Sequence, residues 1–190
     1  MGKGRLEAFS DGVIAVIITI MVLELKVPHG ASLSNLTELG PVFLSYVLSF
    51  VNVGIYWVNH HHLLHTVKKV SGSILWANLH LLFWLSLVPF TTGWMGENQF
   101  VTWPVAIYGF NLLMCGVAYT ILTYAIIRSL GNNSALATAI GSDTKGKISV
   151  AAYIISILLA FYYPWISGAL FVCVSLMWFI PDRRVEKVLS

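Results

Sequence analysis

The sequence predicts an all-α integral membrane bundle of six transmembrane helices with both termini on the cytoplasmic side. Of its 190 residues, 57% are hydrophobic and only 10% are charged, whereas an ordinary soluble chain carries about 25% charged residues. The few charged residues are gathered in short stretches between long apolar runs. The length of each run is close to the roughly 20 residues that are needed to cross a hydrocarbon layer about 30 Å thick. So little charge cannot cover the surface of a soluble domain.

The apolar runs define six spans in one transmembrane domain, 1–190. The spans are expected at Leu6–Val27, Leu39–Leu64, Ile74–Trp94, Val101–Ile127, Ile148–Tyr162 and Pro164–Ile180. Only a minimal turn separates the last two, so a kinked re-entrant pair is the alternative there. Residues 129–146 are rich in Gly, Ser, Asn and Thr, which predicts a flexible cytoplasmic loop. A short helix is expected within that loop, near Ala135–Ile140.

The orientation follows from the basic residues, because cytoplasmic loops hold an excess of Lys and Arg. With the N-terminus inside, every one of the 11 except Lys26 falls on the cytoplasmic side. This cytoplasmic set is Lys3, Arg5, Lys68, Lys69, Arg128, Lys145, Lys147, Arg183, Arg184 and Lys187. The net charge of +3 is then explained by anchoring beside anionic membrane lipid. No nucleic-acid partner is expected.

Asp11 is the most costly polar group in the first span. An ionised Asp in a span costs about 2.5–3.5 kcal/mol, so it should face protein or water and have a partner. At 1.5 Å per residue, Asp11, His61 and His80 lie at a similar depth, roughly 9–14 Å from the inner boundary. Ser10 and Asp11 are therefore expected to tie this helix to its neighbours through His80. Trp57 or Asn78 would assist, with Arg5 at the inner entrance.

A second face of the same helix is apolar. Steps of 100° per residue place Gly12, Val16, Thr19, Ile20 and Leu23 on one stripe. Asp11 lies about 140° from Val16, so the two cannot line the same surface of a straight helix. The stripe is expected to serve a purpose other than anchoring, and packing against another span is the alternative.

A metal site is the weaker interpretation of the histidines in the second span. His61 and His65 are one helical turn apart, which would allow both to bind one ion. However, the adjacent side chains of His60, His61 and His62 point in different directions, and no carboxylate stands at a recognisable ligand spacing. Neither a metal nor another cofactor is expected.

Several motifs resemble one known family. The pattern Arg5-x-x-x-Phe9-Ser10-Asp11 at the start of the first span resembles the signature of the transmembrane protein 175 family of potassium channels. The further similar segments are Trp57 with His60-His61-His62, Asn78-Leu79-His80, and Pro89-Phe90. Six spans also match the repeat unit of that family.

The resemblance implies a potassium-selective, leak-like channel and not an enzyme. A single repeat implies the shorter prokaryotic type, a homotetramer in the plasma membrane whose first helices surround the pore. Carried over by position, Val16, Thr19, Ile20 and Leu23 would line that pore, with apolar rings as constrictions. Glu24 would attract cations at the outer mouth. Val16 departs from the Ile or Leu expected at the first ring, which leaves a wider neck.

Two other functions remain open at this stage. Asp11 and His80 could serve a proton- or cation-coupled secondary transporter, since buried ionisable groups are typical of such proteins. No pair of Gly- or Pro-broken helices in corresponding halves supports a midplane substrate site. Asp11 alone could also titrate and carry protons.

A channel would need another source of selectivity than carbonyl oxygens, because the sequence has no TVGYG-like stretch.

Overall fold

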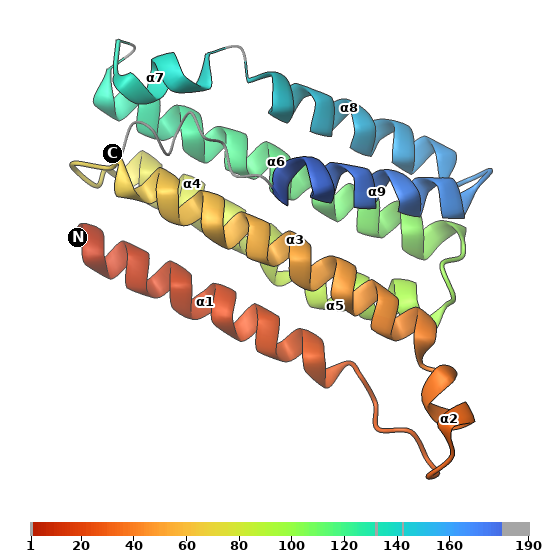
Figure 1. Ribbon diagram of the computed structural model, residues 1–190. Helices are drawn as coiled ribbons and strands as arrows, with labels where there is room; N and C mark the ends of the chain where they lie inside the picture. Colours follow the sequence, from red (N-terminus) through yellow and green to blue (C-terminus); the bar gives the residue numbers. More distant parts are fainter. Residues whose placement is uncertain (1, 132, 142, 180–190) are drawn as a thin grey trace.

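The computed structural model describes residues 2–131, 133–141 and 143–179, and every regular element in them is a helix (Figure 1). The helices are α1 (Lys3–Leu23), α2 (Leu33–Thr37), α3 (Gly40–His65), α4 (Gly72–Ser86), α5 (Val88–Glu97), α6 (Thr102–Leu130), α7 (Ala135–Ile140), α8 (Thr144–Leu159) and α9 (Pro164–Phe179). The predicted all-α fold is confirmed. The short helix expected in the 129–146 stretch is α7, and α8 already begins inside that stretch.

Four segments of the described chain are long and apolar enough to cross a membrane. They are α1, α3, α6 and the 26-residue segment formed by α4 and α5. The predicted fifth and sixth spans correspond to α8 and α9, which have 16 described residues each. Ile180, the predicted end of the sixth span, lies outside the described residues, as do Arg183, Arg184 and Lys187.

The third predicted span is not one continuous helix. It breaks at Leu87, whose N–H donates to the Trp84 carbonyl at 3.2 Å, one residue nearer than in a regular α-helix. Pro89 follows in the first turn of α5 and has no N–H to continue the ladder. The Trp84 carbonyl at this break accepts a hydrogen bond from the Asn111 side-chain nitrogen of α6 at 3.1 Å. This holds for the amide orientation in which both ends of the Asn111 side chain find suitable partners.

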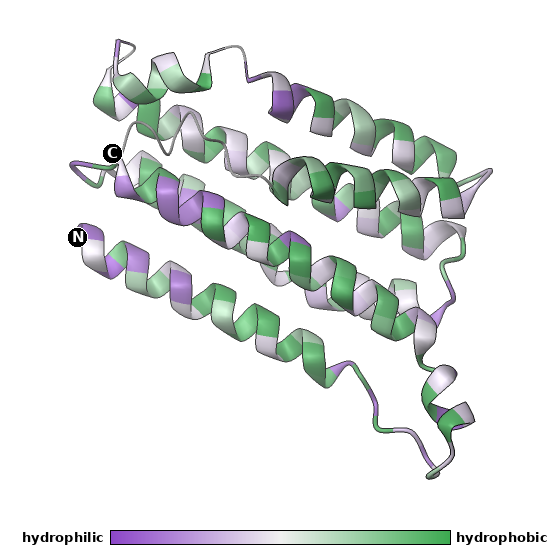
Figure 2. Cartoon of the chain, in the orientation of Figure 1, coloured by the Kyte–Doolittle hydropathy of each residue, from purple (hydrophilic) through white to green (hydrophobic). Residues whose placement is uncertain are grey.

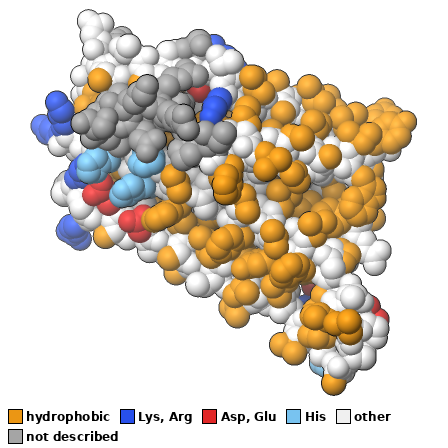
Figure 3. Space-filling model, in the orientation of Figure 1, with side chains coloured by type: hydrophobic (Ala, Val, Ile, Leu, Met, Phe, Trp, Pro, Cys, Tyr) orange, Lys and Arg blue, Asp and Glu red, His pale blue; other side chains and the backbone are white. Residues whose placement is uncertain are grey.

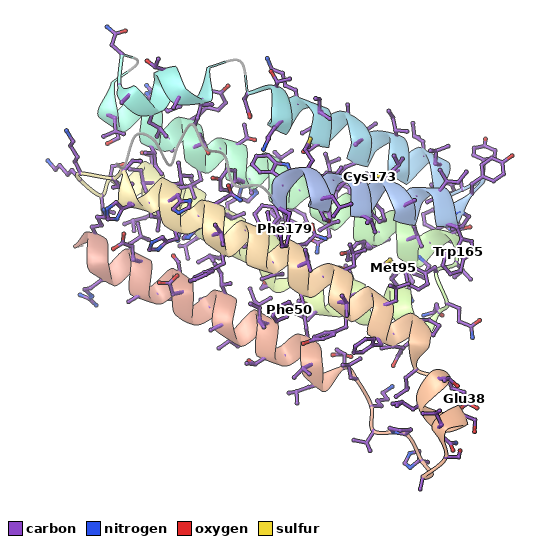
Figure 4. The ribbon with its side chains drawn as sticks, in the orientation of Figure 1. Glu38, Phe50, Met95, Trp165, Cys173 and Phe179 are labelled. Atoms are coloured by element: carbon purple, nitrogen blue, oxygen red, sulfur yellow. The ribbon has the colours of Figure 1, made fainter. Side chains whose placement is uncertain are left out.

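The helices pack side by side, with α1 at one edge of the bundle and α8 at the opposite edge (Figure 1). α1 packs against α3, α4 and α5. One apolar core joins α1, α3, α4 and α6, whereas a second joins α5, α6, α8 and α9 around Tyr108 and Phe171. Met95 contributes to this second core from α5 (Figure 4). α3 and α6 thus connect the edge helix α1 to the α8–α9 pair.

Polar and apolar side chains separate along the long axis of the bundle. Lys, Arg and His side chains gather near the end where the N-terminus lies, and hydrophobic side chains cover most of the remaining visible face (Figure 3). Figure 2 shows the same change along α1, from a polar first half to an apolar second half. At the opposite end, Glu38 lies at the end of α2 and Trp165 at the start of α9 (Figure 4). This distribution is that of a multi-pass membrane protein.

Candidate functional site

One face of α1 attaches the helix to its own subunit. Its buried residues recur every three or four positions, which keeps them on one side of the helix. They are Leu6, Ser10, Ile14, Ile17 and Met21. All but Ser10 are apolar and belong to the first core. This face holds α1 against α3, α4 and α5.

Most of the stripe that the sequence singled out lies on the far side of α1 from these buried residues. Val16, Thr19 and Leu23 each follow a buried residue by two positions, which is a rotation of about 200°. Val16 is 55% exposed, Ile20 42% and Leu23 77%. Thr19 is exposed as well. Val16, Thr19 and Leu23 therefore lie away from the packed face, although Val16 and Leu23 are apolar. Ile20, three positions after the buried Ile17, lies at the edge of that face.

Thr19 is the polar member of this stripe. Its hydroxyl donates to the Val16 carbonyl of its own helix at 2.9 Å. That bond uses the single proton of the hydroxyl and leaves its oxygen lone pairs free to accept. An exposed acceptor oxygen in an apolar surface is suited to contact a cation or water.

Ser10 is the centre of a buried polar connection between three helices. Its hydroxyl donates to the Leu6 carbonyl at 2.8 Å and accepts from the Asn78 side-chain nitrogen of α4 at 2.9 Å. The Asn78 oxygen is 2.7 Å from Nε2 of His60 on α3. An amide oxygen can only accept, so Nε2 of His60 carries the proton. α1 is thereby joined to α3 and α4 by satisfied polar groups.

Asp11 makes a second polar connection, at the surface. The Trp57 indole N–H of α3 donates to Asp11 Oδ1 at 3.0 Å. Arg5 and Phe9 are exposed on the same end of α1. Lys3 donates to the His65 carbonyl at 2.6 Å and so ties the start of α1 to the end of α3. The first two turns of α1 thus hold most of its polar bonds to the subunit.

His80 differs from its expected place in this network. Its Nε2 accepts from the Trp84 indole of its own helix at 2.9 Å. The histidine that reaches Ser10, through Asn78, is His60. Depth counting found the right level but could not tell which histidine turns inward. The Asp11/His80 pairing, on which the transporter alternative rested, is replaced by Asp11–Trp57 and Ser10–Asn78–His60.

α1 borders, from Ala8 to Glu24, a groove of about 860 Å³ between α1 and α5. Val16, Ile20 and Glu24 line one side, and Phe90 and Glu97 are on the other. Glu24 fits there because the opposing position is Gly93, where a Cβ atom would lie 3.1 Å from the Glu24 carboxylate. The groove is therefore apolar along its length, with two carboxylates among its lining residues.

Lys26 closes the α1–α5 contact beyond the groove. Its ammonium is 2.5 Å from a Glu97 carboxylate oxygen. The hydrogen bond and the negative charge of Glu97 raise the pKa of Lys26 above its ordinary value of 10.5. Both side chains are well exposed, so this ion pair is a weak contact compared with the buried bonds of Ser10.

His61 stacks on His65, one turn further along α3. The His61 ring lies 6.3 Å from the rings of His65 and Trp57. Within the described ranges, no three His, Cys, Asp or Glu side chains are grouped to hold a metal ion. Cys115 is buried and Cys173 is exposed on α9 (Figure 4), and both are free.

Comparisons with known proteins identify a family for this chain. Residues 5–89, which contain α1, α3 and α4, match the family model "Endosomal/lysosomal potassium channel TMEM175". The chain is 59% identical over 190 residues to a potassium channel of Chryseobacterium sp. (strain P1-3), covering 100% of this chain and 99% of that protein. It is 36% identical over 101 residues to the endosomal/lysosomal proton channel TMEM175 of Gallus gallus, covering 47% of this chain and 20% of that protein.

A solved structure extends the similarity to the whole fold. The crystal structure of a lysosomal potassium-selective channel TMEM175 homolog from Chamaesiphon minutus superposes with a TM-score of 0.83 at 26% identity, covering 95% of this chain and 97% of that one. The short bacterial relative matches end to end, whereas the animal relative is about five times longer than the matched part. The chain therefore belongs to the TMEM175 family of potassium channels, in the short form found in bacteria.

Proposed function

We propose that the protein is a potassium-selective, leak-like channel in which α1 helices from four copies surround a central pore. The observation that carries this proposal is the difference in burial between the packed face of α1 and its exposed stripe. One face is packed into the subunit, and the stripe of Val16, Thr19, Ile20 and Leu23 is exposed. In the tetramer this stripe faces the axis, and Glu24 stands at the outer mouth.

The same stripe suggests how potassium is preferred without a carbonyl filter. Rings of Val16, Ile20 and Leu23 make a narrow apolar neck in which an entering ion loses part of its hydration. This loss is smaller for weakly hydrated K⁺ than for Na⁺. Thr19 offers an acceptor oxygen in the neck, because its proton is bound to its own helix.

We also propose that α8 and α9 cross the membrane with the four longer spans, which gives six crossings and both termini in the cytoplasm of a bacterial cell. The charge distribution supports this orientation, since Lys3, Arg5 and Arg128 lie at the same end of the bundle as the end of α3 (Figures 1 and 3). Lys26 lies at the other end. A positive cytoplasmic face is typical of inner-membrane proteins.

Neighbouring cysteines on α1 test the pore assignment. The background is a channel without Cys173, since Cys115 is buried. In liposomes loaded with KCl, a positively charged thiol reagent should block flux through Leu23→Cys and leave Val22→Cys conducting. Both positions are exposed in the subunit, but they lie about 100° apart. If the reagent blocked both cysteine variants equally, or blocked only Val22→Cys, a different face of α1 would have to lie at the pore axis.

Selectivity is tested on the same stripe. Leu23→Ala and Thr19→Ala should each lower the ratio of K⁺ to Na⁺ flux, because the neck widens or loses its acceptor oxygen. Mass measurement of the solubilised complex gives the number of copies. An unchanged flux ratio in both variants would show that the neck lies elsewhere.

A further inference from the structure

A stripe of polar residues runs along one side of α3, away from α1 at its second half, where it borders a cavity shared with α6 and α8. Its members are spaced by three or four positions and form one face of the helix. They are Ser45, Ser49, Asn52, Tyr56, Asn59 and His62. Ser45 and Ser49 are fully buried, and Asn52 and Asn59 are nearly so. Such a face inside a membrane protein is costly unless its groups are satisfied or solvated.

The half of this stripe nearer the start of α3 is closed by side-chain hydrogen bonds. Ser49 bonds the Tyr108 hydroxyl at 3.0 Å and accepts from Thr92 at 2.6 Å. Asn52 accepts from Ser175 of α9 at 3.1 Å. Four helices are joined here and their polar groups bond one another, so this half has a structural role.

The other half opens into a cavity of about 80 Å³ between α3, α6 and α8. Its lining runs from Asn52 to His62 on α3 and reaches Asp143 at the start of α8. Since a single water needs about 10–15 Å³ of such space, the cavity has room for a molecule of roughly five heavy atoms. It lies on the side of α3 that faces α6 and α8 and shares no lining residue with the α1 stripe.

The polar groups in the wall of this cavity present mainly acceptors. The hydroxyls of Thr120 and Thr123 donate to carbonyls of their own helix, each at 2.9 Å. The Asn59 side-chain nitrogen likewise donates to Ile55 at 2.8 Å. What these side chains turn outward is oxygen lone pairs. A ligand that donates hydrogen bonds or carries positive charge matches this wall.

Aromatic rings and one carboxylate complete the match to a cation. Tyr56 and Tyr119 meet edge to face, 6.1 Å between centroids, and Trp178 also lines the space. Asp143 is the one carboxylate among the described lining residues, and no Lys or Arg is among them. Aromatic faces beside a carboxylate attract organic ammonium ions. The Lys145 ammonium lies 5.6 Å from the Trp178 centroid, so a cation of the protein itself already contacts this ring at the rim.

We propose that each subunit binds a small alkylammonium cation in this cavity, which we name the α3–α6–α8 cavity. The ligand enters from the end that carries α7, where Asp143 stands, and its alkyl groups lie against Tyr56 and Tyr119. The mainly apolar wall favours a methylated ammonium over a hydrated alkali ion. The site is separate from the pore and does not depend on which helix lines it.

Equilibrium dialysis of the full-length protein with radiolabelled tetramethylammonium, at constant ionic strength, tests this site. Binding should saturate at one cation per chain. Asp143→Asn, which keeps an acceptor for the start of α8, should weaken binding at least tenfold. Gly116→Leu should do the same by filling the space, because a Cβ atom at Gly116 already lies 3.7 Å from the Tyr56 hydroxyl.

Matched variants separate the cavity from other sites. Glu38→Gln removes a carboxylate at the opposite end of the molecule (Figure 4) and should bind as the unaltered protein does. Leu23→Ala changes the stripe on α1 and should also leave binding unchanged. Gly116→Ala fills less of the space. An unchanged thermal unfolding midpoint in this variant shows that a loss of binding does not come from a loss of folding.

Four results would overturn the proposal. The first is the absence of saturable binding at millimolar tetramethylammonium. The second is binding that Asp143→Asn and both Gly116 variants leave intact. The third is a loss of binding in Leu23→Ala, which would place the cation in the pore. The fourth is displacement by KCl at the same concentration as by tetramethylammonium, which would make this an inorganic-cation site.

Discussion

The two halves of α1 are held in different ways. The first half, up to Asp11, is joined to α3 and α4 by hydrogen bonds of Lys3, Ser10 and Asp11. The second half, from Val16 to Leu23, is held by the apolar contacts of Ile17 and Met21. Directional bonds fix the rotation of the helix about its axis, whereas apolar packing fixes mainly its distance from its neighbours. The polar half therefore determines which side chains the apolar half turns outward.

The largest expected effect compares two identical side chains of α1 that are one turn apart and differ in burial. Ile17 is 3% exposed and Ile20 is 42% exposed. Ile17→Ala should lower the free energy of unfolding by about 2–4 kcal/mol, since it leaves a cavity in the core. Ile20→Ala should leave subunit stability nearly unchanged and alter cation flux. Denaturant unfolding in detergent and liposome flux measure the two effects, and equal destabilisation would show that the faces are not distinct.

The next effect concerns the buried network. Asn78→Leu removes the link between Ser10 and His60, and leaves the His60 N–H without its acceptor. A loss of about 1–2 kcal/mol is expected. Asn98→Leu is the matched control, because Asn98 is exposed and bonds only its own helix, at the Trp94 carbonyl. A similar loss in both variants would mean that the network adds nothing to stability.

Substitution of Asp11 should lower stability by a smaller amount, and the loss should depend on the acceptor oxygen of this side chain rather than on its charge. Asp11→Asn keeps an oxygen for the Trp57 indole, whereas Asp11→Ala removes it. The alanine variant should lose about 1 kcal/mol and form fewer intact complexes, as judged by size-exclusion chromatography. A monodisperse Asp11→Ala complex with altered ion selectivity would instead place this carboxylate in the conduction path.

The smallest effect concerns the Lys26–Glu97 ion pair at the end of the apolar half. The pKa of Lys26 is raised by Glu97, so its contribution to stability is complete below pH 10.5 and is lost as the pH rises through the raised value. Thermal unfolding of Lys26→Gln should therefore differ slightly from that of the unaltered protein at pH 7. The difference should vanish in 1 M KCl, because salt screens exposed charges. A difference that persists in salt would indicate a contact other than this ion pair.

The sequence was sufficient for the helical class and for most helix positions. Long apolar runs and clustered charges located α1, α3 and α6 to within a few residues, because span length is set by bilayer thickness. The break at Leu87 was missed, since it depends on Asn111 from a distant helix as well as on Pro89. The five-residue α2 carries no periodic signal and was missed too.

The candidate site was predictable in part. Helical geometry alone separated Asp11 from the Val16–Leu23 stripe, and the four stripe residues are exposed in the subunit, whereas their place in a pore stays a prediction. Counting residues gave the depth of the histidines but not their direction, so His60 was not recognised as the partner of Asn78. The α3–α6–α8 cavity could not be foreseen, because its wall comes from helices whose mutual rotation the sequence does not state.

The proposed crossing of the membrane by α8 would have a consequence for the surrounding lipid. Its 16 residues span about 24 Å, several ångströms less than the roughly 30 Å of an average hydrocarbon layer. Such a mismatch is relieved by thinning of the adjacent leaflets or by snorkelling of flanking side chains. Lipids with shorter acyl chains should consequently collect beside α8. Their headgroups would then lie closer to Asp143, at the start of this helix.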